Sequence, residues 1–131
     1  MNIMEIRDCE GYPGFRVSDT GEVFKGDEPV MAYYSLGYVR VSLRNTKNHY
    51  KSESIHRLVV TAFKGAITRG MFIDHVNGIK DDNRLENLEV VTPRENNLRR
   101  YRLKKREKTL QMESEYFQGL TNYLKRFVSK E

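Results

Sequence analysis

The sequence has a single cysteine, no long apolar run and no basic-then-apolar segment at its start. Because one cysteine can form neither an internal disulfide nor a zinc knuckle, Cys9 excludes disulfide-stapled and zinc-finger classes and fits a reducing compartment. No apolar stretch approaches the length needed to span a bilayer. The opening residues, MNIMEIRDCE, lack the pattern of a secretory signal, so we expect a cytoplasmic protein with no membrane partner.

The basic residues of this chain are concentrated in one segment. The 131 residues carry a formal net charge of +5. Residues 93–108 alone contain eight Arg or Lys and two Glu, a net charge of +6, which leaves −1 for the rest of the chain. Such a segment indicates a polyanionic partner, and a solvated helix face is the alternative interpretation.

The N-terminal part alternates apolar and polar residues between turn residues, which predicts antiparallel strands. Residues 5–25 predict one hairpin, and residues 37–44 with 49–55 predict a second. The positions expected to face the core are Phe15, Val17, Val23, Val39, Val41 and Leu43.

The other face of the second hairpin would carry basic, aromatic and hydroxyl groups. Its residues are Tyr38, Arg40, Ser42 and Arg44. This combination suits a sheet that faces nucleic acid. An ordinary solvated sheet face fits the pattern equally well.

A short helix is predicted from residue 56 to residue 63. The apolar residues at helical spacing are Ile55, Leu58, Val59, Ala62 and Phe63, and Gly65 ends the pattern. For His56 we expect a structural hydrogen bond at the start of this helix rather than metal binding. Arg57 beside it could contact a phosphate.

The segment from residue 72 to residue 97 predicts the order strand, loop, strand, helix. A short apolar run ends in Asp74 and His75, and turn residues and a polar tract follow. Residues 85–91 restore a strand-like pattern. Thr92 and Pro93 then have the residue types of a helix cap and a first helical position.

Three side chains of this segment point to hydrolytic chemistry. Asp74 and Asn96 could converge on one cation, and their oxygen atoms are hard ligands that suit Mg²⁺ or Mn²⁺. His75 is a candidate general base, since an imidazole titrates near neutral pH and can take a proton from water. The alternative is that this Asp-His pair belongs only to the turn of a hairpin.

The motifs DHVNG, NRLENLEVVTP and ENN resemble the HNH nuclease motif, the ββα-metal unit, in the form found in phage and intron-encoded homing endonucleases. The upstream run HRLVVTAFKG resembles the segment that precedes this motif. The resemblance implies that His75 is the general base, that Asp74 is a metal ligand and that Asn87 holds the loop that aims His75. Asn96 falls where many members have a histidine, and the resemblance implies that it also binds the metal.

The run GYPGFRVSDTGEV resembles the NUMOD-type module that accompanies HNH domains and is associated with DNA binding. That module usually opens with a tryptophan, which this chain lacks, so Met4 or Ile6 would stand in its place.

An apolar stripe near the C-terminus predicts an amphipathic helix despite Gly119. Its residues are Tyr116, Phe117, Leu120, Tyr123, Leu124, Phe127 and Val128. The stripe could fold back on the same chain or pair with a second copy, so both a monomer and a homodimer stay open.

Together these features predict an α+β fold: a small antiparallel N-terminal sheet, a connecting helix, the ββα-metal (HNH) unit and a basic C-terminal helical tail. We expect a DNA-binding module in residues 1–50, the nuclease domain in residues 51–100 and the basic, amphipathic helix in residues 101–131.

The predicted function is cleavage of double-stranded DNA by a divalent-metal-dependent HNH endonuclease. We expect each active site to bind one Mg²⁺ or Mn²⁺ and to nick one strand. If the chain is phage-encoded, the expected location is the cytoplasm of the host cell. The predicted DNA contacts are Arg40, Arg44, Arg57, Arg94, Arg99, Arg100 and Arg102. The alternatives are a catalytically inactive DNA-binding regulator on the same scaffold and an RNA-binding accessory protein.

Overall fold

A computed structural model gives the structure of residues 3–128. Residues 1, 2 and 129–131, which belong to the predicted N-terminal module and C-terminal helix, lie outside the described residues. The chain divides into two compact units, residues 1–93 and 94–131.

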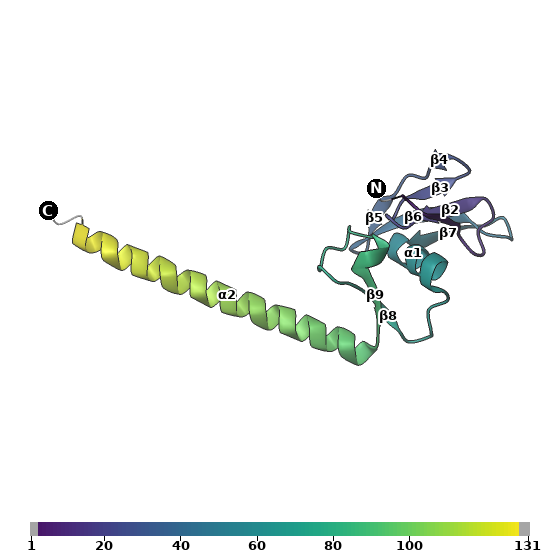
Figure 1. The fold of residues 1–131 in the computed structure, drawn as a ribbon. Coiled ribbons are helices and arrows are strands. Elements are labelled where there is room, and N and C mark those ends of the chain that lie inside the picture. The colour runs from purple at the N-terminus through teal and green to yellow at the C-terminus, as the bar shows by residue number, and fades with distance from the viewer. Residues whose placement is uncertain (1–2, 129–131) are drawn as a thin grey trace. The chain divides into compact units, whose positions relative to one another are not determined.

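The described part of the first unit contains two antiparallel N-terminal sheets and a separate two-stranded antiparallel sheet of residues 72–75 and 88–91, and Figure 1 draws their strands. The first sheet has the order β1-β2-β3-β4, with β1 Ile6–Asp8, β2 Phe15–Ser18, β3 Val23–Lys25 and β4 Glu28–Pro29. The second has the order β5-β6-β7, with β5 Tyr33–Ser35, β6 Tyr38–Arg44 and β7 Tyr50–Ser54. The two predicted hairpins are confirmed, and they lie in separate sheets rather than in one.

The segment between the hairpins, which the sequence presents as a polar link, contains β4 and β5. Strand β4 ends in Pro29 at the edge of its sheet, where a residue without an N–H is tolerated. Strands β5 and β6 are joined by Leu36 and Gly37, both at positive φ (56° and 82°), as a tight hairpin turn requires. Leucine is an unusual residue for this conformation, so the turn has no clear signal in the sequence.

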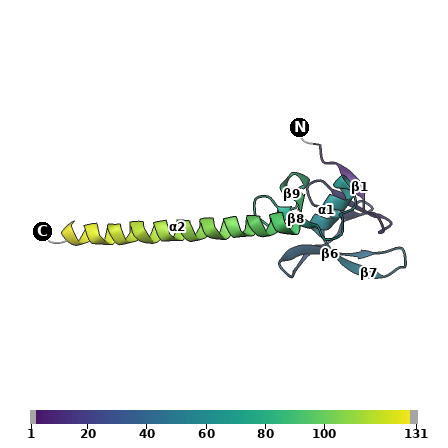
Figure 2. The same ribbon diagram turned by 90° about the horizontal axis from the view of Figure 1, so that it is seen from below.

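Helix α1, Ile55–Lys64, connects the parts of the first unit. It buries Ile55, Leu58, Val59 and Val60, and Gly65 ends it at φ 94°, as the sequence predicts. The helix contacts strands of both sheets and the 3₁₀ turn η1, Leu85–Asn87. Figure 2 shows α1 next to β6 and β7 on one side and near β1 on the other.

The core of the first unit lies around this helix. The predicted core positions Phe15, Val17, Val23, Val41 and Leu43 are all buried, and Val39 packs partly buried against them. Leu88 joins the same cluster from strand β9, Leu88–Val91. The hairpin of β8, Phe72–His75, and β9 is therefore anchored to the core that the two sheets and α1 share.

The second unit is built on one helix, α2, from Pro93 to Val128. Its start at Pro93 agrees with the prediction, and the basic segment and the apolar stripe form one continuous helix. Tyr116, Phe117, Leu120, Tyr123 and Leu124 of the stripe are exposed, while the side chains of Phe127 and Val128 lie outside what the structure describes. Among residues 3–128, no helix combines the length and apolarity that crossing a bilayer requires.

Candidate active site

The β8–β9 hairpin presents Asp74 and His75 at the end of β8. In its antiparallel register His75 is paired with Leu88 and Asp74 with Glu89. Leu88 is only 2% exposed, so the end of the hairpin is fixed to the core next to His75. His75 itself is 7% exposed, and Asp74 is half-buried. The end of β8 thus carries a carboxylate and an imidazole at consecutive positions.

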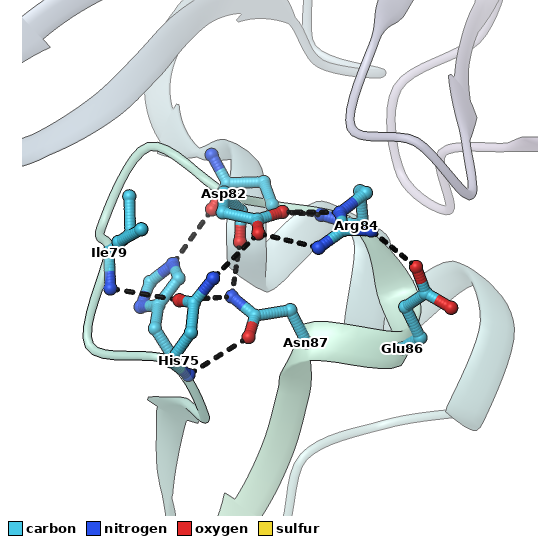
Figure 3. Close-up of polar contacts among 8 residues, drawn as sticks. His75, Ile79, Asp82, Arg84, Glu86 and Asn87 are labelled. Atoms are coloured by element: carbon cyan, nitrogen blue, oxygen red, sulfur yellow. Dashed lines mark hydrogen bonds and ion pairs between the residues drawn. The ribbon is translucent and has the colours of Figure 1, made fainter.

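Asn87 organises the loop between the two strands. Its side-chain Oδ1 accepts a hydrogen bond from the Asn77 backbone N–H at 3.0 Å. Its Nδ2 donates to Asn77 Oδ1 at 2.9 Å and to the Asp82 carbonyl oxygen at 2.8 Å. The side chain is buried, 6% exposed, and Figure 3 shows these bonds crossing the loop. One amide therefore ties both ends of the loop together.

The loop is also fixed on its outer side by charge. Arg84 Nε and Nη2 donate to the two carboxylate oxygens of Asp82, each at 2.8 Å, and Nη1 pairs with Glu86 at 2.6 Å (Figure 3). The hydrogen bonds from Arg84, with one from Asn77, hold the pKa of the Asp82 carboxyl well below its usual range. Asp82 therefore stays ionised and keeps its bonds across the pH range of ordinary assays.

The His75 ring is held by Asn83, a residue that the sequence does not single out. Nε2 of His75 lies 2.8 Å from Asn83 Oδ1, and Asn83 is 5% exposed. A carbonyl oxygen can only accept a hydrogen bond, so this contact requires the tautomer with the proton on Nε2. The other ring nitrogen, Nδ1, is then unprotonated in the neutral ring.

A second histidine packs on the first. The ring centroids of His56 and His75 are 5.2 Å apart in an edge-on arrangement. Tyr38 covers both rings, with centroid distances of 4.9 Å to His56 and 6.3 Å to His75. Lys80 Nζ lies 4.9 Å from the centre of the Tyr38 ring. Contacts from β6, α1 and the loop thus limit the orientations open to the His75 ring.

The expected structural hydrogen bond of His56 is not made by its Nδ1. That atom is buried and has no hydrogen-bond partner among the described residues. Burial, reinforced by His75, Arg57 and Arg40, lowers the pKa of His56 to about 4. The ring is therefore neutral at neutral pH, and it contributes packing rather than charge beside His75.

The lowered pKa of His56 predicts that the folded state loses stability as the pH falls. Because the pKa of His56 is about 4 when folded and about 6.5 when unfolded, the unfolded chain binds the extra proton first, and stability falls as the pH drops from about 6.5 towards 4. Between pH 7.5 and pH 4.5 the wild-type protein should lose about 2 kcal/mol more of its unfolding free energy than the His56→Phe variant, after allowance for the partial exposure of the histidine. Denaturant unfolding of both proteins at the two pH values measures this. Equal losses in both proteins would contradict the assignment.

The predicted DNA-contacting residues lie on three elements. Arg40 and Arg44 lie four residues apart on β6 and so share one face of the strand, and Arg57 is exposed on α1. Arg40 donates to the Oγ and carbonyl oxygen of Ser52 at 2.8 and 2.9 Å. The Arg44 guanidinium lies 4.8 Å from the centre of the Tyr50 ring. The remaining residues, Arg94, Arg99, Arg100 and Arg102, follow one another on α2.

The structure brings His75 and Asn87 together in the first unit, beside Asp74. Asn96 is half-buried on α2 and belongs to the second unit. Its pairing with Asp74 on a metal ion stays a prediction from sequence.

Comparisons with known proteins show what this chain is similar to. Residues 53–98 match the model of the HNH endonuclease family. The chain is 36% identical over 98 residues to the DNA endonuclease I-HmuI of Bacillus phage SP01, covering 71% of this chain and 55% of that protein. It is 40% identical over 62 residues to YosQ of Bacillus subtilis strain 168, whose name places it among prophage-derived HNH homing endonucleases, covering 47% of this chain and 36% of YosQ.

A solved structure is similar as well. The structure described as DNA binding and cleavage by the HNH homing endonuclease I-HmuI aligns with a TM-score of 0.67 and 34% identity, over 75% of this chain and 58% of that one. This chain thus spans little more than half the length of I-HmuI and about a third of YosQ. On these grounds residues 53–98 are similar to the HNH endonuclease family, and the chain is similar to the phage and prophage HNH homing endonucleases.

Proposed function

We propose that this chain is a divalent-metal-dependent DNA endonuclease that cuts one strand per active site. The observation that carries the proposal is the state of His75, a buried imidazole whose Nε2 is bonded to Asn83 within a loop that Asn87 ties together. A general base must be held in one orientation and one tautomer, and this arrangement supplies both.

His75 would act through Nδ1. Because Nε2 donates to Asn83 Oδ1, the lone pair on Nδ1 is available to take a proton from a water molecule. The contacts with His56 and Tyr38 hold the ring while the proton moves. The deprotonated water would then attack the scissile phosphate, and general-base assistance of this kind contributes roughly a hundred- to ten-thousand-fold to the rate.

The residues beside His75 suit a hard divalent cation. Asp74 and Glu89 are partners in the register of the hairpin, so carboxylates from both strands lie on one face. No group of three or more His, Cys, Asp or Glu side chains is gathered into a metal site within the described part of the chain. A site with few protein ligands, all of them oxygen atoms, suits an ion that keeps water and phosphate among its ligands, as Mg²⁺ and Mn²⁺ do.

Asp74 and Asn96 are the proposed protein ligands of this ion. When bound, it would stabilise the negative charge that develops on the phosphate and on the leaving oxygen. Asp74 directly precedes His75 on β8, so a proposed metal ligand and the proposed general base would come from the same strand end.

The outer face of β6 is proposed to bind the DNA. Every second residue of this strand lies on the same face. On the outer face these residues are Tyr38, Arg40, Ser42 and Arg44. Since the Tyr38 ring stacks on His75, this face runs from Arg44 directly to the general base. DNA bound on this face would bring its backbone near the His75 ring. Arg57 on α1 and the basic residues of α2 would add phosphate contacts.

The α2 contribution can be tested by salt dependence. Replacing Arg99, Arg100 and Arg102 together by Gln should weaken DNA binding across all sequences. Each lost phosphate contact should lower the slope of log K against log salt by about 0.9, so the triple variant should lose up to about 2.7. Binding titrations from low to high salt measure the slope.

The matched control removes the same charge outside residues 1–50 and outside the basic segment, from the exposed residues Arg69, Lys125 and Arg126. This control should keep the wild-type slope. An unchanged slope in the variant of the basic segment would mean that its basic residues are merely solvated.

The side chain at position 96 should affect which metal ions support cleavage. A neutral amide oxygen is a weak, hard ligand, whereas an imidazole supplies the nitrogen donor that Zn²⁺, Ni²⁺ and Co²⁺ prefer. Asn96→Ala should raise the metal concentration for half-maximal cleavage at least tenfold, about 1.4 kcal/mol, and Asn96→His should broaden metal use. Nicking rates against the concentration of each ion test this. Identical metal profiles for all three proteins would leave Asp74 as the one proposed ligand.

The proposed function as a whole is tested with supercoiled plasmid. In Mg²⁺ or Mn²⁺ we expect open-circle DNA to accumulate before linear DNA, and EDTA to stop the reaction. Linear DNA appearing at once would show coordinated double-strand cleavage instead. Binding without any cleavage in either ion would favour the inactive DNA-binding regulator.

A further inference from the structure

The turn between β2 and β3 is a locked structure on the N-terminal sheet. Ser18 is fully buried, and its Oγ accepts a hydrogen bond from the Glu22 backbone N–H at 2.9 Å. The Ser18 N–H donates to the Glu22 carbonyl oxygen at 2.8 Å, and the Gly21 N–H donates to the Ser18 carbonyl oxygen at 3.1 Å. The turn from residue 18 to residue 22 therefore has little freedom to move.

This turn is bonded directly to the loop that carries Asn83. The Leu85 backbone N–H donates to the Asp19 carbonyl oxygen at 2.8 Å, which connects the N-terminal sheet to the start of η1. The bond is made between backbone atoms, so it fixes the main chain of the loop two residues after Asn83.

Gly21 allows the closest approach between the turn and the loop. A Cβ atom placed on Gly21 would lie 2.9 Å from Asn83 Cβ and 3.1 Å from the Asn83 carbonyl oxygen. Real Cβ atoms do not approach so closely, so a side chain at residue 21 forces the turn and Asn83 apart. The backbone of Gly21 has φ +90°, a conformation that other residues rarely adopt.

Asn83 is consequently held from two sides. The turn contacts its backbone and Cβ, and on the other side Asn87 Nδ2 donates to the carbonyl oxygen of the preceding residue, Asp82. The Asn83 side chain, placed in this way, accepts the hydrogen bond from Nε2 of His75.

We propose that the β2–β3 turn is a positioning element for the general base, acting from Gly21 and the Asp19 carbonyl through Asn83 to His75. The N-terminal sheet is then part of the catalytic unit, in addition to any contact that it makes with DNA. This inference rests on the proposed role of His75, and its test separates the two.

The test compares Gly21→Ala with Gly14→Ala. Gly14 has nearly the same φ, +83°, but no atom lies within 4 Å of a Cβ placed there. Both substitutions place alanine at a positive φ, and only the first brings a new Cβ atom against Asn83. At saturating DNA, we expect the single-turnover nicking rate of Gly21→Ala to fall at least about tenfold, with DNA affinity within about threefold of wild type. Gly14→Ala should keep both values within about threefold.

A double-mutant cycle shows whether the turn acts through Asn83. Asn83→Ala removes the acceptor of the His75 hydrogen bond, so adding Gly21→Ala to it should slow nicking no further. Effects that multiply would overturn the proposal, as would a Gly21→Ala protein that nicks at the wild-type rate. If Gly21→Ala does not fold, Gly21→Asn keeps the Cβ while tolerating positive φ better, and the same comparison applies.

The His75 ring signals in NMR spectra give a readout that needs no cleavage. Gly21→Ala should shift them and Gly14→Ala should not. A wild-type protein that fails to nick would refute the proposed function, whereas unshifted His75 signals in Gly21→Ala would refute the role of the turn.

Discussion

His75→Ala should lose at least about a hundredfold of the nicking rate while its affinity for DNA stays within a few-fold of wild type. The side chain is almost fully buried at the end of β8, where it would take a proton from water in the transition state. A neutral base of this kind contributes little to binding in the ground state, so the loss should fall on the chemical step alone. Single-turnover nicking and a binding titration in EDTA measure the two quantities.

His49→Ala is the matched control, because His49 is exposed between β6 and β7. It should nick at the wild-type rate. A His75→Ala protein that retains more than about a tenth of the wild-type rate would rule out His75 as the general base.

Asn87→Ala should be the most destabilising single change at the site, and it should also abolish most of the activity. The substitution leaves the Asn77 N–H and the Asp82 carbonyl oxygen without their partner in a part-buried loop. Each unsatisfied buried group costs about 1–3 kcal/mol, so we expect a loss of about 3 kcal/mol in the free energy of unfolding. The loop that carries Asn83 would then no longer hold the His75 ring, and nicking should fall by at least about a hundredfold.

Denaturant unfolding and single-turnover nicking, both at a temperature where the variant is folded, measure these effects. Asn122→Ala, at an exposed position of α2, is the control and should change neither. Asn87→Asp adds a second test: a carboxylate keeps the acceptor for Asn77 N–H but loses the donor to Asp82, so it should be nearly as damaging as Ala. Wild-type nicking by a folded Asn87→Ala protein would contradict the role of the loop.

The parts of the fold that the sequence predicts are those governed by local periodicity. Strand β6 alternates buried and exposed residues because one face meets the core, so Val41 and Leu43 are recognisable as core positions. Helix α1 follows an apolar spacing that ends at Gly65. The turn at Leu36 and the short strand β5 are missed because their geometry contradicts the usual preference of leucine.

The candidate site also has residues that the sequence indicates and residues that it does not. Asp74, His75 and Asn87 belong to the stretch that resembles the HNH motif, and this resemblance, rather than composition or spacing alone, indicates their roles. Asn83 lies in a polar tract whose composition predicts only a loop, and nothing local indicates that its side chain is buried against His75. Gly21 has the pattern of an ordinary hairpin turn, because its contact partner, Asn83, is distant in the sequence.

The tautomer of His75 is the feature on which the proposed mechanism depends most directly, and it can be measured. Long-range ¹H–¹⁵N correlation spectra of the ring, recorded at a pH where the ring is neutral, distinguish a proton on Nε2 from a proton on Nδ1. The contact of Nε2 with Asn83 Oδ1 at 2.8 Å predicts the Nε2–H tautomer, with the Nδ1 lone pair free to accept a proton. A ring with its proton on Nδ1 would have no lone pair to offer a water molecule at that position, and it would contradict the assignment of His75 as the general base.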